Sequence, residues 1–328
     1  PQISCYAVIC LMLPIIYEPP IITAEGEFLA VLMSTQDFLS RLDERARRSP
    51  LREGWTERLL IDEACACQLA EGDLVHSDEL MLLDARALGG GASIPLASAL
   101  HILHTWRRAL MDEPADLLRA HRPGQADREW IGPPPSGIVA ADAPEVIDIA
   151  RRDAWRRVLR QTEAFTPLLA AAIVWDAWLT LKPEAAADWR APLLAALVLK
   201  ARGVTSQFLL PLDTGRRHAP YRRHPKQPIE ARLTGFLEWA QMAATRAGRK
   251  LDNLGNAEGV MRRKIATRRK HSRLPALIDL MLSRSAISVP MAAAHLGVSP
   301  QAVARLLPKL GAVPQEITGR ARFRLWSV

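Results

Sequence analysis

Residues 288–310, SVPMAAAHLGVSPQAVARLLPKL, fit two short helices joined by a sharp turn, and this segment constrains the fold more than any other. Gly297 stands where the turn needs a positive φ, which glycine adopts without steric cost. Ser299 suits the N-cap of the second helix, and Pro300 suits its first helical position. Small or apolar residues occupy the positions that fill the space between the helices: Ala293, Leu296, Val298, Val303 and Leu306. The pattern predicts a helix-turn-helix.

The second helix of this unit should present a polar outer face. Its exposed positions are predicted to be Ser299, Pro300, Gln301, Ala304 and Arg305. Gln301 and Arg305 are four residues apart and therefore point the same way. In a major groove, Gln can bond an adenine edge and Arg a guanine edge. Pro308 should end or kink the helix, so we expect it to be short. A unit used only for packing or dimerisation is the alternative.

Residues 316–326 predict a β-hairpin after that unit. Gly319 lies near its tip, and three arginines alternate with Ala321, Phe323 and Leu325. Period-two alternation places the arginines on one face of the hairpin and the apolar residues on the other. The three arginines are Arg320, Arg322 and Arg324. A basic wing of this kind would contact phosphates or a minor groove, so the whole region predicts a winged helix-turn-helix.

Positive charge is concentrated in the same region. Residues 260–328 contain thirteen Lys and Arg and two acidic residues, a net charge of +11, whereas residues 1–259 contain 30 basic and 33 acidic residues, a net charge of −3. A small domain with that field attracts a polyanion and gains counterion release on binding it. The basic residues that lead into the winged unit are Arg262, Arg263, Lys264, Arg268, Arg269 and Lys270. We expect double-stranded DNA as the partner; a solvated basic face is the alternative.

The rest of the chain shows helical periodicity and no strand alternation, which predicts a mainly α fold. The predicted helices are 37–47, 55–69, 77–88, 95–111, 143–162, 167–181, 191–202, 229–249 and 274–282. Residues 167–181 and 191–202 are apolar on nearly every side and should lie at the centre of a helical domain. Residues 122–144 and 216–228 are expected to be loops, and residues 252–259 a break.

Short segments of this helical part resemble the Fic family of nucleotidyl transferases. The segments that carry the resemblance are 123–125, 130–135, 167–169, 181–190 and 193–212. In addition, Glu71 and Gly72, with Cys67 four residues before the Glu, are similar to the inhibitory helix of some Fic proteins. The resemblance implies an all-helical domain that transfers a nucleotide monophosphate to a target hydroxyl. A chance match between Ala- and Leu-rich helices is the alternative.

The Fic motif is degenerate in this chain. The resemblance places Lys182 where the family has its general-base His, before Pro183, and a protonated Lys cannot accept a proton. Asp188 stands in place of the motif's Asn. Arg190 matches the first motif arginine, whereas Leu193 replaces the second. The resemblance therefore implies a retained scaffold without catalytic residues.

Two further features of the Fic family are altered. Ala187 and Trp189 replace glycines whose backbone N–H groups would bind phosphate. By resemblance, Glu71 would pair with the missing second arginine, so it has lost that partner as well. Both changes favour a pseudoenzyme.

From about Leu39 onward the chain also looks like an uncharacterised bacterial family with an unnamed domain and a C-terminal helix-turn-helix. Residues 45–54 (RARRSPLREG) and 71–84 (EGDLVHSDELMLLD) carry this resemblance, which implies no activity. We divide the chain into an N-terminal extension (1–34), a helical region (35–111), a degenerate Fic-like domain (112–259), a basic linker (260–273) and the winged helix-turn-helix (274–328).

We predict a cytoplasmic DNA-binding protein, a transcriptional regulator with an inactive Fic-like domain, and a homodimer that presents two half-sites. A divergent nucleotidyl transferase and an antitoxin-like interaction protein are the alternatives. We expect no metal or cofactor, because the four cysteines lack zinc-ligand spacing. The apolar run 3–16 is too short to cross a bilayer; a signal peptide is its alternative interpretation.

Overall fold

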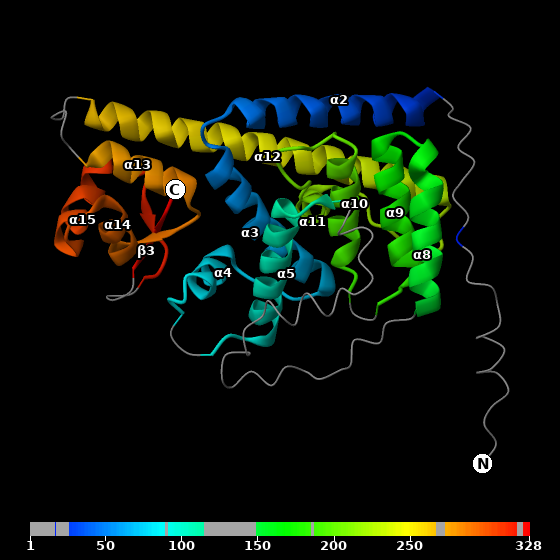
Figure 1. Cartoon of the computed structure of the whole chain (residues 1–328), viewed down its shortest axis with the longest axis horizontal. Helices are drawn as coiled ribbons and strands as arrows, with labels where there is room; N and C mark the ends of the chain where they lie inside the picture. Colours follow the sequence, from blue (N-terminus) through cyan, green and yellow to red (C-terminus); the bar gives the residue numbers. More distant parts are fainter. Residues whose placement is uncertain are drawn as a thin grey trace, which may run out of the picture.

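The computed structural model describes residues 17, 26–88, 91–114, 149–184, 187–266, 273–319 and 324–328. Over these residues the chain is mainly helical, with a small three-stranded sheet near its C-terminal end. This confirms the predicted fold class, a helical part followed by a winged helix-turn-helix. In Figure 1 the winged unit lies at the opposite end of the molecule from α8 and α9. Within the described residues no helix has the length and apolarity that a bilayer crossing requires.

The helical part, which we call the body, ends with one long helix. Its elements are α2 (Gly26–Arg48), α3 (Arg52–Glu71), α4 (Ser77–Asp84), α5 (Ile94–Met111), α8 (Ile149–Gln161), η1 (Thr162–Ala164), α9 (Pro167–Leu181), α10 (Arg190–Ala201), α11 (Leu212–His218) and α12 (Ile229–Ile265). The bounds of α9 are those predicted from its apolar run.

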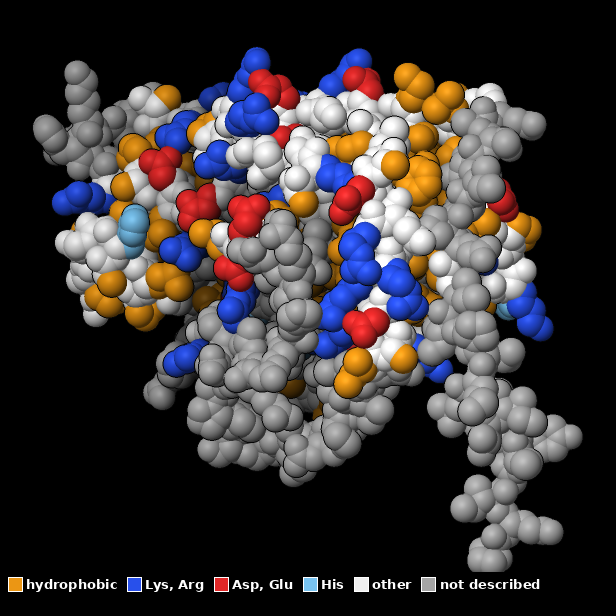
Figure 2. All heavy atoms as spheres, turned by 45° about the vertical axis from the view of Figure 1, so that its right-hand side comes forward, with side chains coloured by type: hydrophobic (Ala, Val, Ile, Leu, Met, Phe, Trp, Pro, Cys, Tyr) orange, Lys and Arg blue, Asp and Glu red, His pale blue; other side chains and the backbone are white. Residues whose placement is uncertain are grey.

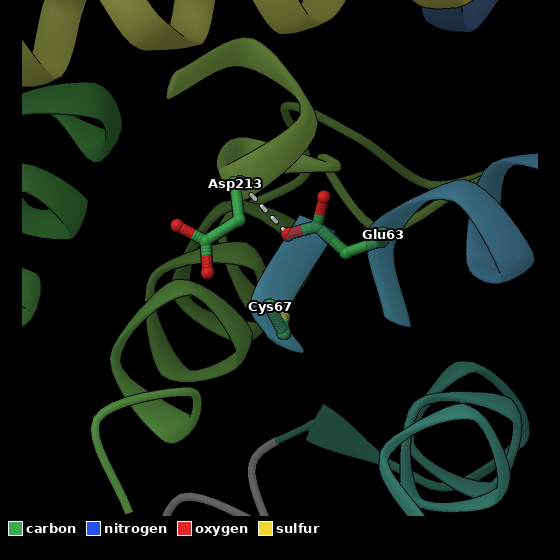
Figure 3. A group of neighbouring side chains, drawn as sticks. All are labelled: Glu63, Cys67 and Asp213. Carbon is green, nitrogen blue, oxygen red and sulfur yellow. Dashed lines mark hydrogen bonds between the residues drawn. The ribbon is translucent and has the colours of Figure 1, made fainter. Parts of the chain in front are cut away.

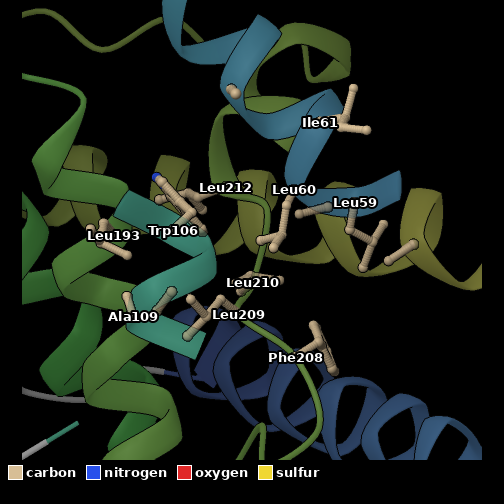
Figure 4. Close-up of a cluster of buried hydrophobic side chains, with 14 of the residues drawn as sticks. Leu59, Leu60, Ile61, Trp106, Ala109, Leu193, Phe208, Leu209, Leu210 and Leu212 are labelled. Carbon is tan, nitrogen blue, oxygen red and sulfur yellow. The ribbon is translucent and has the colours of Figure 1, made fainter. Parts of the chain in front are cut away.

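Tryptophans anchor the core of the body. Trp55, Trp106, Trp175 and Trp239 are fully buried. The rings of Trp175 and Trp239 meet edge to face with their centroids 5.2 Å apart, which joins α9 to α12. The indole N–H of Trp55 donates to the carbonyl of Ala247 at 2.8 Å and joins α3 to the same helix. Figure 4 shows Trp106 of α5 among leucines from α3, α10 and the segment before α11.

Asp176 explains the polar position on the otherwise apolar helix α9. Its carboxylate is fully buried and accepts hydrogen bonds from Arg223 and Arg232, each at 2.8 Å, and from the Tyr17 hydroxyl at 3.0 Å. A buried carboxylate without partners would be costly, whereas two guanidinium groups compensate its charge. The cluster fixes α9 against α12 and against the segment that precedes α12.

Helix α12 is continuous through residues 252–259, so the predicted break there is wrong. The glycines Gly255 and Gly259 led to that prediction, and each costs a helix about 1 kcal/mol relative to alanine. Leu251, Leu254 and Met261 are buried along the same stretch, and their burial outweighs this cost. Residues 260–265, predicted to begin a linker, are the last turns of α12.

Three smaller differences have local causes. Helix α2 begins at Gly26, inside the predicted extension. Helix α11 occupies residues 212–218 and so takes up the beginning of the predicted loop 216–228. Helix α4 ends at Asp84, before the predicted end at residue 88. The ends of these helices depend on tertiary packing and on local hydrogen bonds. The periodicity of apolar residues therefore locates them poorly.

In its described residues the winged unit has three α-helices, a 3₁₀ turn and a small sheet. Its elements are α13 (Leu274–Ser283), β1 (Ile287–Ser288), α14 (Val289–Leu296), α15 (Pro300–Leu306), η2 (Leu307–Leu310), β2 (Gln315–Glu316) and β3 (Leu325–Ser327). The strand order is β1-β3-β2, and both pairs are antiparallel. Glu316 pairs with Trp326 on β3, which confirms a hairpin there. The two-residue strand β1 was not predicted.

Arg58 of α3 holds the winged unit against the body. Its buried guanidinium donates to the carbonyls of Met281 and Leu282, at 3.0 and 3.3 Å, where α13 ends. It also donates to the carbonyls of Gly54 and Val328, at 2.8 and 3.3 Å. The last carbonyls of a helix have no partner within that helix, so one arginine satisfies them from a neighbouring element. Together with the apolar contacts between α12 and α13, this contact fixes the orientation of the winged unit relative to the body.

Replacement of Gly54 should break this docking. A Cβ atom at position 54 would lie 1.6 Å from the backbone oxygen of Leu282, which cannot move without shifting α13. We expect Gly54→Ala to lower the free energy of unfolding by about 2 kcal/mol or more, as measured by urea denaturation. The matched control is Gly255→Ala, whose Cβ would meet Leu51 Cδ1 at an ordinary 3.9 Å. That variant should be as stable as the wild type or more stable. Equal stabilities of the two variants would contradict the docking described here.

Candidate nucleic-acid interface

The turn between α14 and α15 has the geometry that its sequence predicts. Gly297 has φ +63° and ends α14 in the left-handed region. Ser299 caps α15, and its hydroxyl accepts the backbone N–H of Ala302 at 3.2 Å. Ser288 caps α14 in the same way through Met291, at 3.2 Å. These caps satisfy N–H groups that have no partner in the first turn of a helix.

Small and apolar residues hold the two helices together. Ala293, Leu296 and Val303 are buried between them, as predicted, while Val298 and Leu306 are partly buried. The crossing therefore depends on a few short side chains and leaves the other side of α15 free for solvent.

The outer face of α15 is exposed over its whole length. Ser299, Pro300, Gln301, Ala304 and Arg305 are all exposed, as the sequence predicts. Helix α15 ends at Leu306 and a 3₁₀ turn follows at Pro308, so the expected short helix is confirmed. Figure 1 shows α15 at the outer end of the winged unit, turned away from the body.

Lys309 is a further exposed basic residue directly after α15, and the sequence reasoning missed it. It is exposed in η2, four residues beyond Arg305. The spacing of Gln301, Arg305 and Lys309 could have indicated it. We expected Pro308 to end the regular structure and so did not extend the face that far.

The wing is described only in part. Arg324 is exposed and its Nε lies 4.0 Å from a carboxylate oxygen of Glu316. The neighbouring Leu325 is buried, which is the alternation predicted for this strand. The predicted phosphate contacts Arg320 and Arg322 lie outside the described residues.

The basic residues before the winged unit divide into two kinds. Arg262 donates to Glu258 and to Asp279 of α13, both at 2.7 Å, so it joins the body to the winged unit. Arg263 and Lys264 are exposed at the end of α12. Arg268, Arg269 and Lys270 lie outside the described residues. Of the six predicted residues, Arg263 and Lys264 are therefore the two within the described part of the chain that remain available to a polyanion.

Internal ion pairs occupy the Fic-like motif positions. Lys182, in the left-handed region with φ +48°, pairs with Asp188. Glu184 is fully buried between Arg152 and Arg190, with Arg190 Nε 2.9 Å from its carboxylate. The charged groups of this loop thus compensate one another.

The other motif positions differ in burial, since Pro183 and Leu193 are buried whereas Glu71 and Gly72 are exposed. Leu193 is buried in α10 and Pro183 follows the end of α9. Gly72 caps α3 with φ +104°. Glu71 accepts a hydrogen bond from Gln68 at 3.4 Å, and burial, with the nearby Asp188 carboxylate, raises its pKa. The segments 123–125 and 130–135 of the resemblance lie outside the described residues.

Two buried carboxylates and a thiol meet where α3 contacts α11. Glu63, Cys67 and Asp213 bring one ligand atom each within 4.8 Å of the others (Figure 3). Glu63 already accepts the backbone N–H groups of Asp213 and Thr214, at 2.9 and 2.8 Å, and the Thr214 hydroxyl at 2.9 Å. Protein donors thus use both its oxygens. The sequence did not predict this cluster, since Asp213 is 150 residues from Glu63.

Cationic side chains gather in patches on the surface. Figure 2 shows several groups of Lys and Arg on one face, separated by neutral and acidic side chains. The exposed arginines of the winged unit are therefore not the molecule's only concentration of positive charge.

Comparisons with known proteins match both parts of the chain. Residues 144–266 match a family described as a protein of unknown function (DUF1612), and residues 274–328 match an HTH DNA binding domain. The chain is also 29% identical, over 365 aligned residues, to the uncharacterized protein y4cF of Sinorhizobium fredii (strain NBRC 101917 / NGR234). That alignment covers 88% of this chain and 93% of the relative. The predicted unnamed domain and C-terminal helix-turn-helix are confirmed, and the Fic resemblance stays a prediction.

The buried acidic cluster should make stability depend on pH. Burial, and then repulsion from Asp213, raises the pKa of Glu63 to about 8, whereas an unfolded chain has a glutamate pKa of about 4.3. The native state therefore retains a proton that the unfolded state loses, and the free energy of unfolding should fall as pH rises from about 5 to about 8. Asp213→Asn removes one of the two charges and should flatten this fall. Urea denaturation across this range measures both effects.

The exposed Glu230 of α12 supplies the control for that series. Glu230→Gln should retain the pH dependence of the wild type. A wild-type stability that rises between these pH values, or a slope that Asp213→Asn leaves unchanged, would show that the cluster does not hold the extra proton.

Proposed function

We propose that this protein binds double-stranded DNA through α15 and the wing and that it regulates transcription. The observation that carries the proposal is the exposed, polar face of α15 in a unit that matches an HTH DNA binding domain. A recognition helix contacts bases mainly through its N-terminal residues, so a short helix is sufficient.

In this proposal, Gln301 and Arg305 contact the bases. Both are exposed on α15, and their spacing of four residues places them on one face. Arg can bond guanine and Gln adenine through paired hydrogen bonds. Ser299 sits at the helix N-terminus, where its backbone and hydroxyl are suited to a phosphate.

Phosphate contacts would come from basic residues around that helix. Arg263 and Lys264 at the end of α12 and Lys309 in η2 are exposed. Arg320, Arg322 and Arg324 of the wing, with Arg268, Arg269 and Lys270, complete the proposed set. Arg262 takes a different part, because its ion pairs with Glu258 and Asp279 fix the orientation of the winged unit.

The body is proposed to be a non-catalytic, Fic-like scaffold. The ion pairs of the charged motif residues support this. Lys182 pairs with Asp188, and Arg190 pairs with the buried Glu184. A paired ammonium is a poor general base, and an arginine that neutralises a buried carboxylate is not available to a phosphate. We further propose a homodimer, since two linked half-sites would raise the affinity of a small headpiece.

Base reading and phosphate binding should be separable by mutation. Arg305→Ala should lose about 1–3 kcal/mol of discrimination between sites and so relax the sequence preference. Arg322→Ala should weaken binding to all duplexes alike and reduce the salt dependence by about one ion. Gel shifts against a selected site and a scrambled duplex, at several salt concentrations, measure both quantities.

Arg160 of α8 gives a matched control, since it is an exposed arginine on a helix of the body. Arg160→Ala should bind like the wild type. If the wild type ignores every duplex at low salt, or if Arg305→Ala retains full preference, then α15 is not the recognition helix.

The scaffold proposal predicts that the protein does not label itself with a nucleotide. Incubation with radiolabelled ATP should leave the chain unlabelled, because Lys182, at the general-base position, is an ammonium paired with Asp188. Lys182→Ala, at a half-exposed position, tests whether any labelling depends on the general-base position. Labelling of the wild type that disappears in this variant would make the protein an active nucleotidyl transferase.

A further inference from the structure

A cationic groove lies in the body, apart from the winged unit. A cavity of about 570 Å³ opens between α3, α11, α12 and the segment before α4. Leu59, Val75 and Pro211 form part of its apolar wall. Its lining contains one acidic side chain, Asp62, the thiol of Cys65, and six basic or imidazole groups: His76, Arg217, His218, Arg246, Arg249 and Lys250.

Two helices bring these groups together. Arg246, Arg249 and Lys250 are three and four residues apart on α12 and so share one face. Arg217 and His218 end α11. That helix lies close to α12, since a Cβ atom at Gly215 would be 2.1 Å from the Trp239 carbonyl. The glycine thus allows the approach that sets the width of the groove.

The groove contains more basic side chains than nearby carboxylates that could neutralise them. Lys250 pairs with Asp62. Arg217, Arg246 and Arg249 have no carboxylate within 4.0 Å among the residues that the structure describes. Burial, and then the charges of Arg246 and Arg217, lower the pKa of His218, as expected where cations are crowded.

A second cavity of about 350 Å³ adjoins the first and shares Ala66 and Arg217 with it. The other arginines of this cavity have partners within the protein. Arg216 lies 3.5 Å from Asp213, and Arg223 bonds the buried Asp176. Arg217 therefore stands between the two cavities with its guanidinium available to a ligand.

We propose that this groove binds a small polyanion that carries two or more phosphate groups. Guanidinium groups bind phosphate oxygens through paired, charge-assisted hydrogen bonds, and three such groups exceed what one monoanion can satisfy. The volume of the groove is in the range of small-molecule sites, and its concave shape with apolar walls suits a compact ligand better than the convex backbone of a duplex. The proposal does not depend on DNA binding by the winged unit.

The test uses inorganic triphosphate and the full chain, in a chloride buffer without phosphate or sulfate. Isothermal titration should show saturable binding of one triphosphate per chain. Arg217→Ala and Arg246→Ala should each weaken the affinity about tenfold or more, since each removes a charge-assisted contact. Arg246→Lys should weaken it less, because the charge remains. Arg160→Ala makes the same charge change on α8 and should bind like the wild type.

Two results would overturn the proposal. The first is absence of triphosphate binding by the wild type. The second is equal affinity in Arg217→Ala, Arg246→Ala and Arg160→Ala, which would indicate diffuse attraction to the whole surface. If the first result is accompanied by a loss of duplex affinity in Arg217→Ala, the groove is assigned to a DNA backbone instead. Thermal denaturation of each variant confirms that it is folded.

Discussion

The contact between Arg58 and the end of α13 is the interaction on which the arrangement of the two parts depends. One buried guanidinium satisfies the carbonyls of Met281 and Leu282 at the end of α13, and Gly54 beside it allows α3 to approach the Leu282 oxygen. Hydrogen bonds from a charged donor contribute more to stability than neutral ones, so these contacts favour the docked position over a freely tethered one. The exposed face of α15 therefore has a fixed orientation relative to α12 and the body.

Buried charges follow one rule across the body. Asp176 is held by two arginines, Glu184 lies between two more, and Glu63 accepts three hydrogen bonds from the protein. Each carboxyl group thus has partners within the fold, although burial and the nearby Asp213 still raise the pKa of Glu63, and each cluster joins segments far apart in the sequence. The cationic groove differs, because Arg217, Arg246 and Arg249 are exposed and have no carboxylate within 4.0 Å among the described residues.

Local chemistry made the winged unit predictable and left the body's boundaries uncertain. Gly297, Ser299 and Pro300 each require one backbone conformation, so the turn could be located residue by residue. The continuity of α12 could not, because Gly255 and Gly259 lower helix propensity and only the burial of Leu254 and Met261 restores it. Arg58 and the Glu63 cluster were also missed, since their partners lie 150 or more residues away. Side-chain alternation identified the hairpin, but nothing local indicates the two-residue strand β1.

Hydrogen–deuterium exchange of the full chain, with and without a duplex, tests the central claim most directly. If α15 enters a groove, backbone amides of residues 297–309 should exchange more slowly in the presence of DNA, while those of α8 and α9 should be unchanged. Exchange at residues 297–309 that stays the same under conditions where the duplex is bound would contradict the claim and would move the interface elsewhere on the molecule.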